Sequence, residues 1–360
     1  MEVALVHDYL TQRGGAERVV LSMQKAFPGA PLYTSLYDPE ATLPGFRGTD
    51  VRTLSINRVG ALRHNHRLAL PLLAPAFSRL RVRADVTVCS SSGWSHGIRT
   101  EGRKLVYCYA PARWLYQAER YLGTGRAGAR ALLSALTPLL RGWDRRAART
   151  ADRYVTSSTM MRDSIRAVYG IDADLLPPPH TIDPGGHQQP VDGVEPGFLL
   201  CVSRLLPYKN VDAIVEAVNG MRDQRLIVVG SGPEIGRLTA LAGPNVRVLG
   251  SVTDEQLRWL YAESLGLVAA SYEDYGLTPL EAASFGKPVA VLRWGGFLDT
   301  VVEGDTGVFF ERAEPSAVRD AVLRLAQQRW DRPRIQAHAE QYSEPGFTAR
   351  LQDLVTQVAA

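Results

Sequence analysis

Short apolar runs, each separated from the next by a helical segment, constrain the fold more than any other feature of the sequence. In the second half of the chain these runs are Phe198–Val202, Leu226–Val229, Val246–Leu249, Gly266–Ala270, Val289–Leu292 and Gly307–Phe310. Helical patterns fill the segments between them and include stretches around Asn210–Met221, Glu255–Glu263 and Pro279–Phe285. Fully apolar strands that alternate with helices are typical of a parallel sheet covered on both faces. The sequence therefore predicts an α/β fold with a doubly wound sheet.

The first half repeats this rhythm less regularly, and the length suits two domains. Its apolar runs are Val3–Val6, Val86–Ser90, Leu105–Cys108 and Tyr154–Ser157, with a helix expected over Glu17–Phe27. A chain of 360 residues exceeds one ordinary core. Proline and glycine are frequent between the halves and indicate a linker. We expect an N-terminal domain over 1–180, a linker over 181–196, a C-terminal domain over 197–340, and a helix over 341–360 that covers the second domain or packs back on the first.

Composition indicates a soluble globular protein. The chain is 45% hydrophobic and 22% charged, and no apolar run reaches the roughly 18–20 residues that a membrane helix needs. The N-terminus enters a strand-like run without the pattern of a signal peptide. Three widely spaced cysteines argue against a disulfide framework or a zinc site and for a reducing compartment. We therefore expect a cytoplasmic protein.

Charge is distributed unevenly along the chain. Residues 1–190 hold 25 Lys/Arg and 15 Asp/Glu, a balance of +10, whereas residues 191–360 hold 16 and 22, a balance of −6. Such asymmetry indicates an anionic partner for the first half: nucleic acid, a phospholipid surface or a phosphate-bearing acceptor. The basic segment from Arg52 to Arg83 surrounds the apolar stretch Leu68–Phe77. It is either a peripheral contact with an anionic membrane at the inner face or an ordinary solvated surface.

Two glutamates eight positions apart form the strongest candidate site. Glu273 lies in the loop after a predicted strand, and Glu281 lies in the helix that follows. One interpretation is a capping box, with Thr278 as N-cap and Glu281 three residues later, but it does not explain Glu273. The other is a donor site in which backbone amides bind a diphosphate and the carboxylates accept hydrogen bonds from sugar and ribose hydroxyls. The remaining donor-binding candidates of this loop are Tyr275, Gly276, Leu277 and Thr278.

Two cations follow the first strand of the second half. Arg204 and Lys209 lie in the loop after Phe198–Val202, close to a predicted helix start. An arginine fork and a lysine point charge are suited to a diphosphate, and each charged hydrogen bond contributes roughly 1.5–3 kcal/mol. Either cation alone is more often a solvated loop residue. Together with the two glutamates they indicate a phosphate-binding site.

These motifs, in this order, resemble glycosyltransferase family 4, the retaining GT-B enzymes, whose donor-site signature is E-x7-E. The resemblance is close over residues 198–312 and looser in the first half. It implies two Rossmann-like domains that face each other across a cleft, and a sugar transferred with retention from a nucleoside diphosphate sugar to a hydroxyl. In the family, the Arg and Lys contact the donor diphosphate and the segment around Gly250–Val252 lies against the base. We therefore carry over Glu273, Arg204 and Lys209 as catalytic residues and Ser251 and Val252 as donor-binding residues.

In the first half the same resemblance points to a glycine pair and to two polar motifs. Gly14 and Gly15 precede the helix over Glu17–Phe27. In family members such a pair faces the donor phosphates, and the alternative is a flexible turn.

The segments Ser90–Gly97 and Tyr107–Trp114 resemble a mannosyltransferase-like subgroup that often has histidine where this chain has Tyr109. Tyrosine cannot carry imidazole chemistry near neutral pH, which puts the donor sugar in doubt. Tyr109 and His96 are further catalytic candidates, with a structural histidine as the alternative for His96, and Arg113 is the candidate at the acceptor.

The resulting prediction is a hexosyltransferase whose first-choice donor is GDP-mannose and whose second choice is a UDP-sugar. No metal and no further cofactor is required, because the chain has no suitably placed D-x-D pair and the two cations suffice for the leaving group. The acceptor is a glycan, a lipid-linked sugar or a small aglycone.

Three other classes of protein stay open. They are a nucleotide- or glycan-binding pseudoenzyme, a GT-B epimerase or phosphorylase, and a nicotinamide enzyme suggested by a poor glycine fingerprint at 230–236. A nucleic-acid binder is disfavoured because no basic platform interleaved with aromatics is present.

Overall fold

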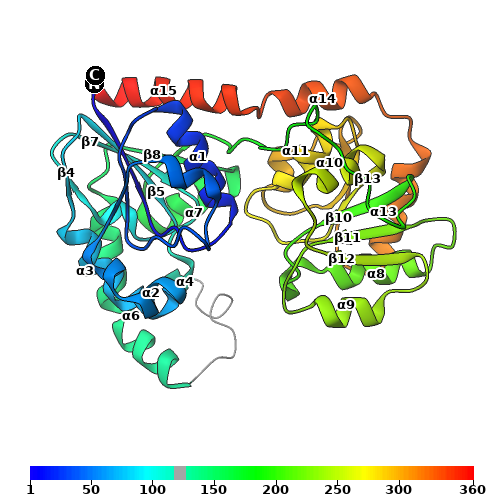
Figure 1. The fold of residues 1–360 in the computed structure, drawn as a ribbon, viewed down its shortest axis with the longest axis horizontal. Helices are drawn as coiled ribbons and strands as arrows, with labels where there is room; N and C mark the ends of the chain where they lie inside the picture. The colour runs from blue at the N-terminus through cyan, green and yellow to red at the C-terminus, as the bar shows by residue number, and fades with distance from the viewer. Residues whose placement is uncertain (117–126) are drawn as a thin grey trace. The chain divides into compact units, whose positions relative to one another are not determined.

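The structure is a computed structural model that describes residues 1–116 and 127–360, with the side chains of 66, 67, 71 and 127–135 left out (Figure 1). The described chain divides into two compact units, each with its own parallel sheet. Unit 1 contains Met1–Pro178 and Glu344–Ala360, and unit 2 contains Pro179–Ser343. Among the described residues, no helix combines the length and the apolar character that crossing a bilayer requires.

Unit 1 is built on a seven-stranded sheet with the order β3-β2-β1-β5-β7-β8-β9. Every neighbouring pair in this sheet is parallel. The strands are β1 (Val3–His7), β2 (Leu32–Thr34), β3 (Val51–Thr53), β5 (Val86–Ser91), β7 (Arg103–Cys108), β8 (Arg153–Thr156) and β9 (Asp174–Leu175), and β4 (Arg81–Val82) pairs separately with β6 (Arg99–Thr100). The helices are α1 (Gly15–Ala26), α2 (Gly60–His64), α3 (Leu70–Arg79), α4 (Arg113–Tyr116), α6 (Ala127–Ala148), α7 (Thr159–Tyr169) and α15 (Glu344–Ala359), with short 3-10 turns at Pro44–Gly48, Ser55–Arg58 (η2), His66–Ala69 and Ser95–Gly97.

Unit 2 is built on a six-stranded sheet with the order β12-β11-β10-β13-β14-β15, and all its pairs are parallel. The strands are β10 (Phe198–Val202), β11 (Leu226–Val229), β12 (Val246–Gly250), β13 (Ser264–Ala269), β14 (Val289–Leu292) and β15 (Gly307–Phe310). The helices are α8 (Val211–Asn219), α9 (Ile235–Leu241), α10 (Asp254–Glu263), α11 (Leu277–Ser284), α12 (Phe297–Thr300), α13 (Pro315–Gln327) and α14 (Arg332–Glu340), with a 3-10 turn η5 (Pro207–Lys209). The predicted doubly wound α/β architecture is thus confirmed.

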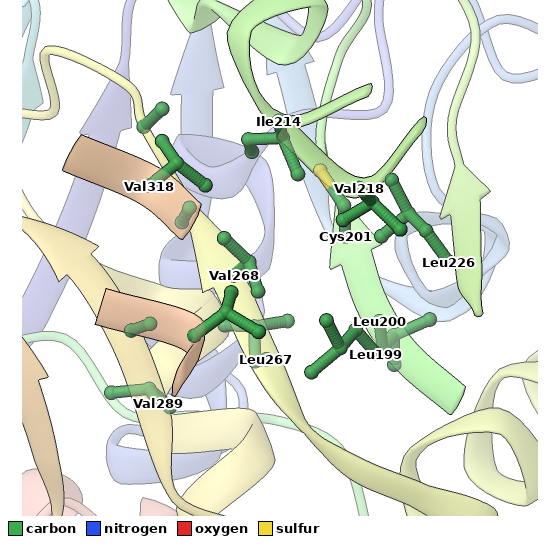
Figure 2. Close-up of a cluster of buried hydrophobic side chains, with 14 of the residues drawn as sticks. Leu199, Leu200, Cys201, Ile214, Val218, Leu226, Leu267, Val268, Val289 and Val318 are labelled. Carbon is green, nitrogen blue, oxygen red and sulfur yellow. The ribbon is translucent and has the colours of Figure 1, made fainter. Parts of the chain in front are cut away.

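The core of unit 2 explains why its strands could be predicted from the sequence. Side chains of β10 and β13 meet those of α8 and α13 in one buried cluster (Figure 2). Leu200, Val268 and Val218 are fully buried members of it. Because both faces of the sheet are covered, its strands are apolar at nearly every position, which is the pattern that the sequence displays.

The Pro- and Gly-rich stretch between the halves is attached to unit 2 along part of its length. Val191 is buried in the unit 2 core, and Ile182 and Val194 pack against that core. The amide of Gln189 also donates to the carbonyl of Glu255 at 3.1 Å. The expectation of a linker without core residues is therefore wrong for this part, because its few apolar side chains find a buried surface beside them.

Helix α15 belongs to unit 1, although it is far from the rest of that unit in sequence. Phe347, Leu351 and Val355 recur at helical spacing and are buried with residues of α1, β5 and β7. Gln352 donates from Nε2 to the carbonyl of Ala26 at 2.7 Å. The structure thus decides between the two placements that the sequence left open, in favour of the first unit.

We predict that Leu351→Ala destabilises unit 1 while unit 2 keeps its stability. Removing a fully buried leucine costs about 2–5 kcal/mol through lost burial and the cavity left behind. Thermal unfolding followed by calorimetry should show the transition of unit 1 moving to lower temperature. Leu323→Ala, at an exposed position of α13, is the control and should change little. Equal, small effects of both substitutions would contradict the packing role of α15.

We also predict a pH dependence that originates at Lys287. This lysine is buried, donates from Nζ to the carbonyl of Ser264 at 2.7 Å, and has its pKa lowered by burial from 10.5 to about 8. Between these two values the unfolded chain binds more protons than the folded one, so this group makes the fold more stable as pH rises from 8 to 10.5. Lys287→Met should reduce that rise in urea-unfolding series recorded at several pH values. An unchanged profile would show that Lys287 titrates normally.

Candidate functional site

The direction of strand addition in unit 2 reverses between β10 and β13. From β10 the chain adds β11 and β12 on one side, and from β13 it adds β14 and β15 on the other. In open α/β sheets, ligands bind outside the carboxyl ends of the strands at a reversal of this kind. Lys209 follows β10 and Glu273 follows β13, so both lie at this point.

Lys209 and Glu273 form an ion pair between Nζ and Oε1. Only 6% of Lys209 is exposed, whereas Glu273 is half-buried. Ser271 donates from Oγ to the same Glu273 oxygen at 3.4 Å. A buried ammonium is costly without a partner, and the Glu273 carboxylate supplies that partner.

A tyrosine connects Arg204 to this pair. Arg204 is exposed and donates from Nη2 to the Tyr208 hydroxyl at 3.1 Å. The ring of Tyr208 lies 4.9 Å from Nζ of Lys209. The two predicted cations are thus joined through Tyr208, which the sequence interpretation did not single out although it lies within the motif. Arg204 keeps a solvent-facing guanidinium close to a buried ammonium, an arrangement suited to a polyanion.

Local backbone geometry fixes the loop that carries Lys209. Asn210 has φ +50°, in the left-handed region, and its Nδ2 donates to the carbonyl of Ala270 at 2.9 Å. Asparagine adopts this conformation more readily than most residues. The loop after β10 is thereby tied to the end of β13, and α8 starts at the next residue.

Close backbone contacts hold the Glu273 loop. The amide of Gly296 donates to the carbonyl of Glu273 at 2.9 Å, and a Cβ at Gly296 would lie 2.3 Å from Cα of Tyr275. A Cβ at Gly276 would lie 2.5 Å from the Phe297 ring. Both glycines are therefore required for the packing of this loop. Helix α11 begins directly after this loop, with Leu277 and Thr278 in its first turn.

The position of Glu281 overturns one interpretation of the sequence. Helix α11 begins at Leu277 with Gly276 as its N-cap, and no side chain caps it. The expected capping box with Thr278 is therefore wrong, because the helix starts before that residue. Glu281 instead accepts a hydrogen bond from the Tyr261 hydroxyl at 2.7 Å. Tyr261 belongs to α10, so this helix orients one Glu281 oxygen. The arrangement is consistent with a binding role for the Glu281 carboxylate.

The loops after β11 and β12 lie at the same edge of the sheet. Gly230 has φ +145° and would place a Cβ 1.8 Å from the carbonyl oxygen of Ser203, so only glycine fits beside the Arg204 loop. Its amide donates to the carbonyl of Gly250 at 2.8 Å. Ser251 is exposed and Val252 half-buried just beyond that glycine. Both predicted base-binding residues thus lie at the carboxyl edge.

The direction of strand addition in unit 1 also reverses, between β1 and β5. The buried carboxylate of Asp8 follows β1 at this point. Asp8 accepts hydrogen bonds at 2.6 Å from the amides of Ser92 and Ser95 and from Oγ of Ser92. Asp8 therefore fixes the loop after β5. The sequence interpretation missed it, although an acidic residue directly after an apolar strand was a usable signal.

Gly14 and Gly15 lie at the start of α1, on the same edge of the unit 1 sheet. Gly14 is the N-cap in an extended conformation, and Gly15 is exposed. A Cβ at Gly14 would lie 2.5 Å from Oε2 of Glu17. Burial by itself would raise the pKa of the Glu17 carboxyl, but the hydrogen bond and charge of His7 outweigh it and hold the pKa below 4.5.

Tyr109 ends a chain of hydrogen bonds across the ends of β1, β5 and β7. Its hydroxyl donates to the carbonyl of Ala16 at 3.2 Å and lies 3.0 Å from Oγ of Ser90. Ser90 Oγ in turn lies 2.9 Å from Nδ1 of His7. Burial raises the pKa of Tyr109, so the phenol is neutral. His7 and Ser90 were not among the predicted site residues, because nothing along the sequence connects them to Tyr109.

His96 lies inside the unit 1 core. Only 2% of it is exposed; its Nδ1 lies 2.9 Å from Oγ of Ser91 and its Nε2 lies 3.1 Å from Oδ1 of Asp144. These are the contacts of a structural histidine that anchors α6, so a catalytic role for His96 finds no support in this geometry. Arg113, the predicted acceptor residue, is half-buried at the start of α4. In the described ranges, no group of three or more His, Cys, Asp or Glu gathers as metal ligands would.

Comparison with known proteins agrees with this geometry. Residues 196–328 match the family described as "Glycosyl transferases group 1". The chain is 30% identical over 209 residues to D-inositol 3-phosphate glycosyltransferase of Acidothermus cellulolyticus, covering 49% of this chain and 46% of that protein. It is 27% identical over 237 residues to a GDP-mannose-dependent alpha-(1-6)-phosphatidylinositol monomannoside mannosyltransferase of Mycolicibacterium smegmatis, covering 55% of this chain and 61% of that one.

A solved structure extends the similarity over the whole chain. Anabaena HepE in complex with UDP and glucose has a TM-score of 0.72 at 15% identity, covering 99% of this chain and 100% of that one. The chain spans about half the length of the curated relatives that it matches. Both units are Rossmann-like α/β domains, and the fold is that of the GT-B glycosyltransferases.

Proposed function

We propose that this protein is a glycosyltransferase that moves a hexose from a nucleoside diphosphate sugar to a hydroxyl acceptor, with retention of the anomeric configuration. The observation that carries the proposal is the Lys209–Glu273 ion pair at the reversal point of the unit 2 sheet. Open α/β sheets bind nucleotides at that point, and a charged lysine there matches a diphosphate.

Each residue has a role in this proposal. Lys209 and Arg204 bind the diphosphate and neutralise the charge that develops on the leaving group. Glu273 accepts hydrogen bonds from the donor sugar, and Glu281, oriented by Tyr261, accepts them from the ribose. The departing phosphate takes the acceptor proton, so no side chain serves as general base. No metal ion is needed, since the two cations supply the positive charge.

The first-choice donor is GDP-mannose, and a UDP-sugar is the second. The mannosyltransferase of Mycolicibacterium smegmatis is described as GDP-mannose-dependent, which supports the first. The Anabaena structure holds UDP and glucose, which supports the second. The acceptor is a glycan, a lipid-linked sugar or a small aglycone, and we place the reaction in the cytoplasm, next to the inner face of an anionic membrane.

A binding-only protein is the second candidate, and Tyr109 favours it. The Tyr109 proton is donated to the carbonyl of Ala16, and its oxygen is beside Ser90. A phenol engaged in this way has no second proton to donate to a sugar. Such a protein would bind a nucleotide sugar without transferring the sugar.

The donor screen separates the two candidates. Thermal unfolding with GDP-, UDP-, ADP- and dTDP-sugars, each with and without EDTA, should show an increase in melting temperature for one base, because ligands of the native state stabilise it by mass action. Release of the nucleoside diphosphate in the presence of acceptor sugars, and the anomer formed, then report transfer and retention. Stabilisation without release supports the binding-only candidate, and no stabilisation by any nucleotide contradicts both.

We predict that Lys209→Ala weakens binding of the nucleoside diphosphate roughly tenfold to hundredfold. The substitution removes a charged hydrogen bond to phosphate, which is worth roughly 1.5–3 kcal/mol. Isothermal titration with GDP and UDP provides the measurement. Arg222→Ala, an exposed position of unit 2, is the control and should bind as the wild type does. Unchanged affinity in a folded Lys209→Ala protein would remove Lys209 from the site.

We predict a different result for Glu273→Gln. The amide keeps the size of the side chain and an oxygen that can accept from Lys209, but it loses the charge. The diphosphate should therefore bind with similar affinity, and sugar transfer should slow by at least about tenfold. Comparing GDP or UDP affinity with turnover on the same preparation makes the distinction. Equal loss of affinity and turnover would assign Glu273 to nucleotide binding instead.

A further inference from the structure

An uninterrupted run of positive charge covers one part of unit 1. Residues 51–84 contain seven arginines and no aspartate or glutamate. Arg58, Arg79 and Arg81 are exposed. We call the surface formed by β3, η2, α2 and α3 the α3 face. In Figure 1, its helices lie in the lower part of unit 1, next to α6.

The charges on this face lack acidic neighbours. Arg58, Arg79 and Arg81 form no hydrogen bond or ion pair with the described part of the chain. By contrast, Arg52 at the edge of the face is paired with Asp50 at 2.7 Å, and Arg83 with Glu101 at 3.2 Å. The uncompensated arginines leave a local excess of positive charge that an anionic partner would neutralise.

Large apolar side chains are exposed among these arginines. Leu68 is 57% and Leu72 is 46% exposed, and Val59 is exposed beside Arg58. Leu139 of α6 is 67% exposed and lies one helical turn before Trp143, whose Nε1 donates to Oγ of Ser78 in α3 at 2.8 Å. Single exposed leucines are ordinary, but several on adjoining helices form a patch typical of an interaction surface.

The face also contains a hollow of about 380 Å³ between η2 and α3. Leu54, Ile56, Leu72 and Pro75 give it an apolar lining, and Arg79 and Arg81 also line it. Apolar walls with two cations at the same opening match an amphiphile that carries a negative headgroup and a hydrocarbon tail. Aromatic side chains are missing from this lining, so stacking on nucleic-acid bases is not provided for.

We propose that the α3 face binds the surface of a bilayer that contains anionic phospholipid. The arginines contact lipid phosphates, and the exposed leucines enter the boundary between headgroups and acyl chains. The hollow accepts part of an acyl chain from the lipid layer that faces the protein. This inference concerns unit 1 alone and does not depend on the glycosyl transfer proposed above.

The test is co-sedimentation of the full chain with vesicles of phosphatidylcholine, either alone or mixed with phosphatidylglycerol. We expect binding to the mixed vesicles only, and weaker binding as salt increases. Binding to neither kind of vesicle, or equal binding to both, overturns the proposal. Equally tight binding to a short duplex DNA also overturns it, since charge alone would then explain the interaction.

Two double variants examine the charged and apolar parts separately. Arg79→Glu with Arg81→Glu should weaken vesicle binding at least about tenfold, since each basic residue near an anionic surface contributes several-fold. Leu68→Ser with Leu72→Ser should weaken binding while its salt dependence stays. The matched control is Arg222→Glu with Arg329→Glu, which makes the same charge change at exposed positions of unit 2.

Thermal unfolding verifies that every variant is folded, and the exposed positions make this the expected result. The control should bind vesicles nearly as the wild type does. If the control loses as much binding as the Arg79/Arg81 variant, net charge and not the α3 face is responsible, and the proposal fails. The proposal also fails if the Arg79/Arg81 variant binds like the wild type.

Discussion

A buried ammonium paired with a half-buried carboxylate determines how the loops of unit 2 are arranged. Lys209 is buried, and its removal from water is compensated by Glu273 beside it. The bond between Asn210 and Ala270 brings the two loops together, and the glycines at 276 and 296 let the Glu273 loop approach its neighbours. In the function proposed above, a diphosphate would meet a lysine that its ion pair has already oriented, so little of the binding energy is needed to order it.

The two units use the same topological position with opposite electrostatics. In unit 2 the reversal of strand order is occupied by a cation with a carboxylate partner. In unit 1 it is occupied by Asp8, whose charge is satisfied by two backbone amides and a serine hydroxyl. The first arrangement leaves Arg204 as an exposed positive group for an anion, whereas the second consumes the hydrogen-bonding capacity of its carboxylate in holding a loop. Similar sheets thus carry an exposed cation beside an ion pair in one unit and a loop anchor in the other.

The sequence predicted the strands of unit 2 well because all but the edge strand β12 are apolar on both faces and each is followed by a helix. It missed β2, β3 and β9, which have two or three residues and are too short to show a period. The capping box at Glu281 was wrong because the helix starts before Thr278, and Glu281 instead accepts a hydrogen bond from Tyr261, twenty residues earlier. The contact between the buried His96 and Asp144 could not be predicted from the local sequence either, because Asp144 lies in the distant helix α6. Local patterns predict elements and loop chemistry, but partners that are distant in sequence appear only once the elements pack.

The return of α15 to unit 1 has a consequence for the order in which the chain matures. Residues 179–343 form unit 2 as one continuous stretch, so it has all its own parts as soon as that stretch leaves the ribosome. Unit 1 begins earlier but lacks Phe347, Leu351 and Val355 until these residues, which follow unit 2 in the sequence, have been made. Its apolar surface over α1, β5 and β7 stays uncovered during that interval. Unit 1 is therefore started before unit 2 and completed after it, and its apolar surface depends on protection from aggregation in the meantime.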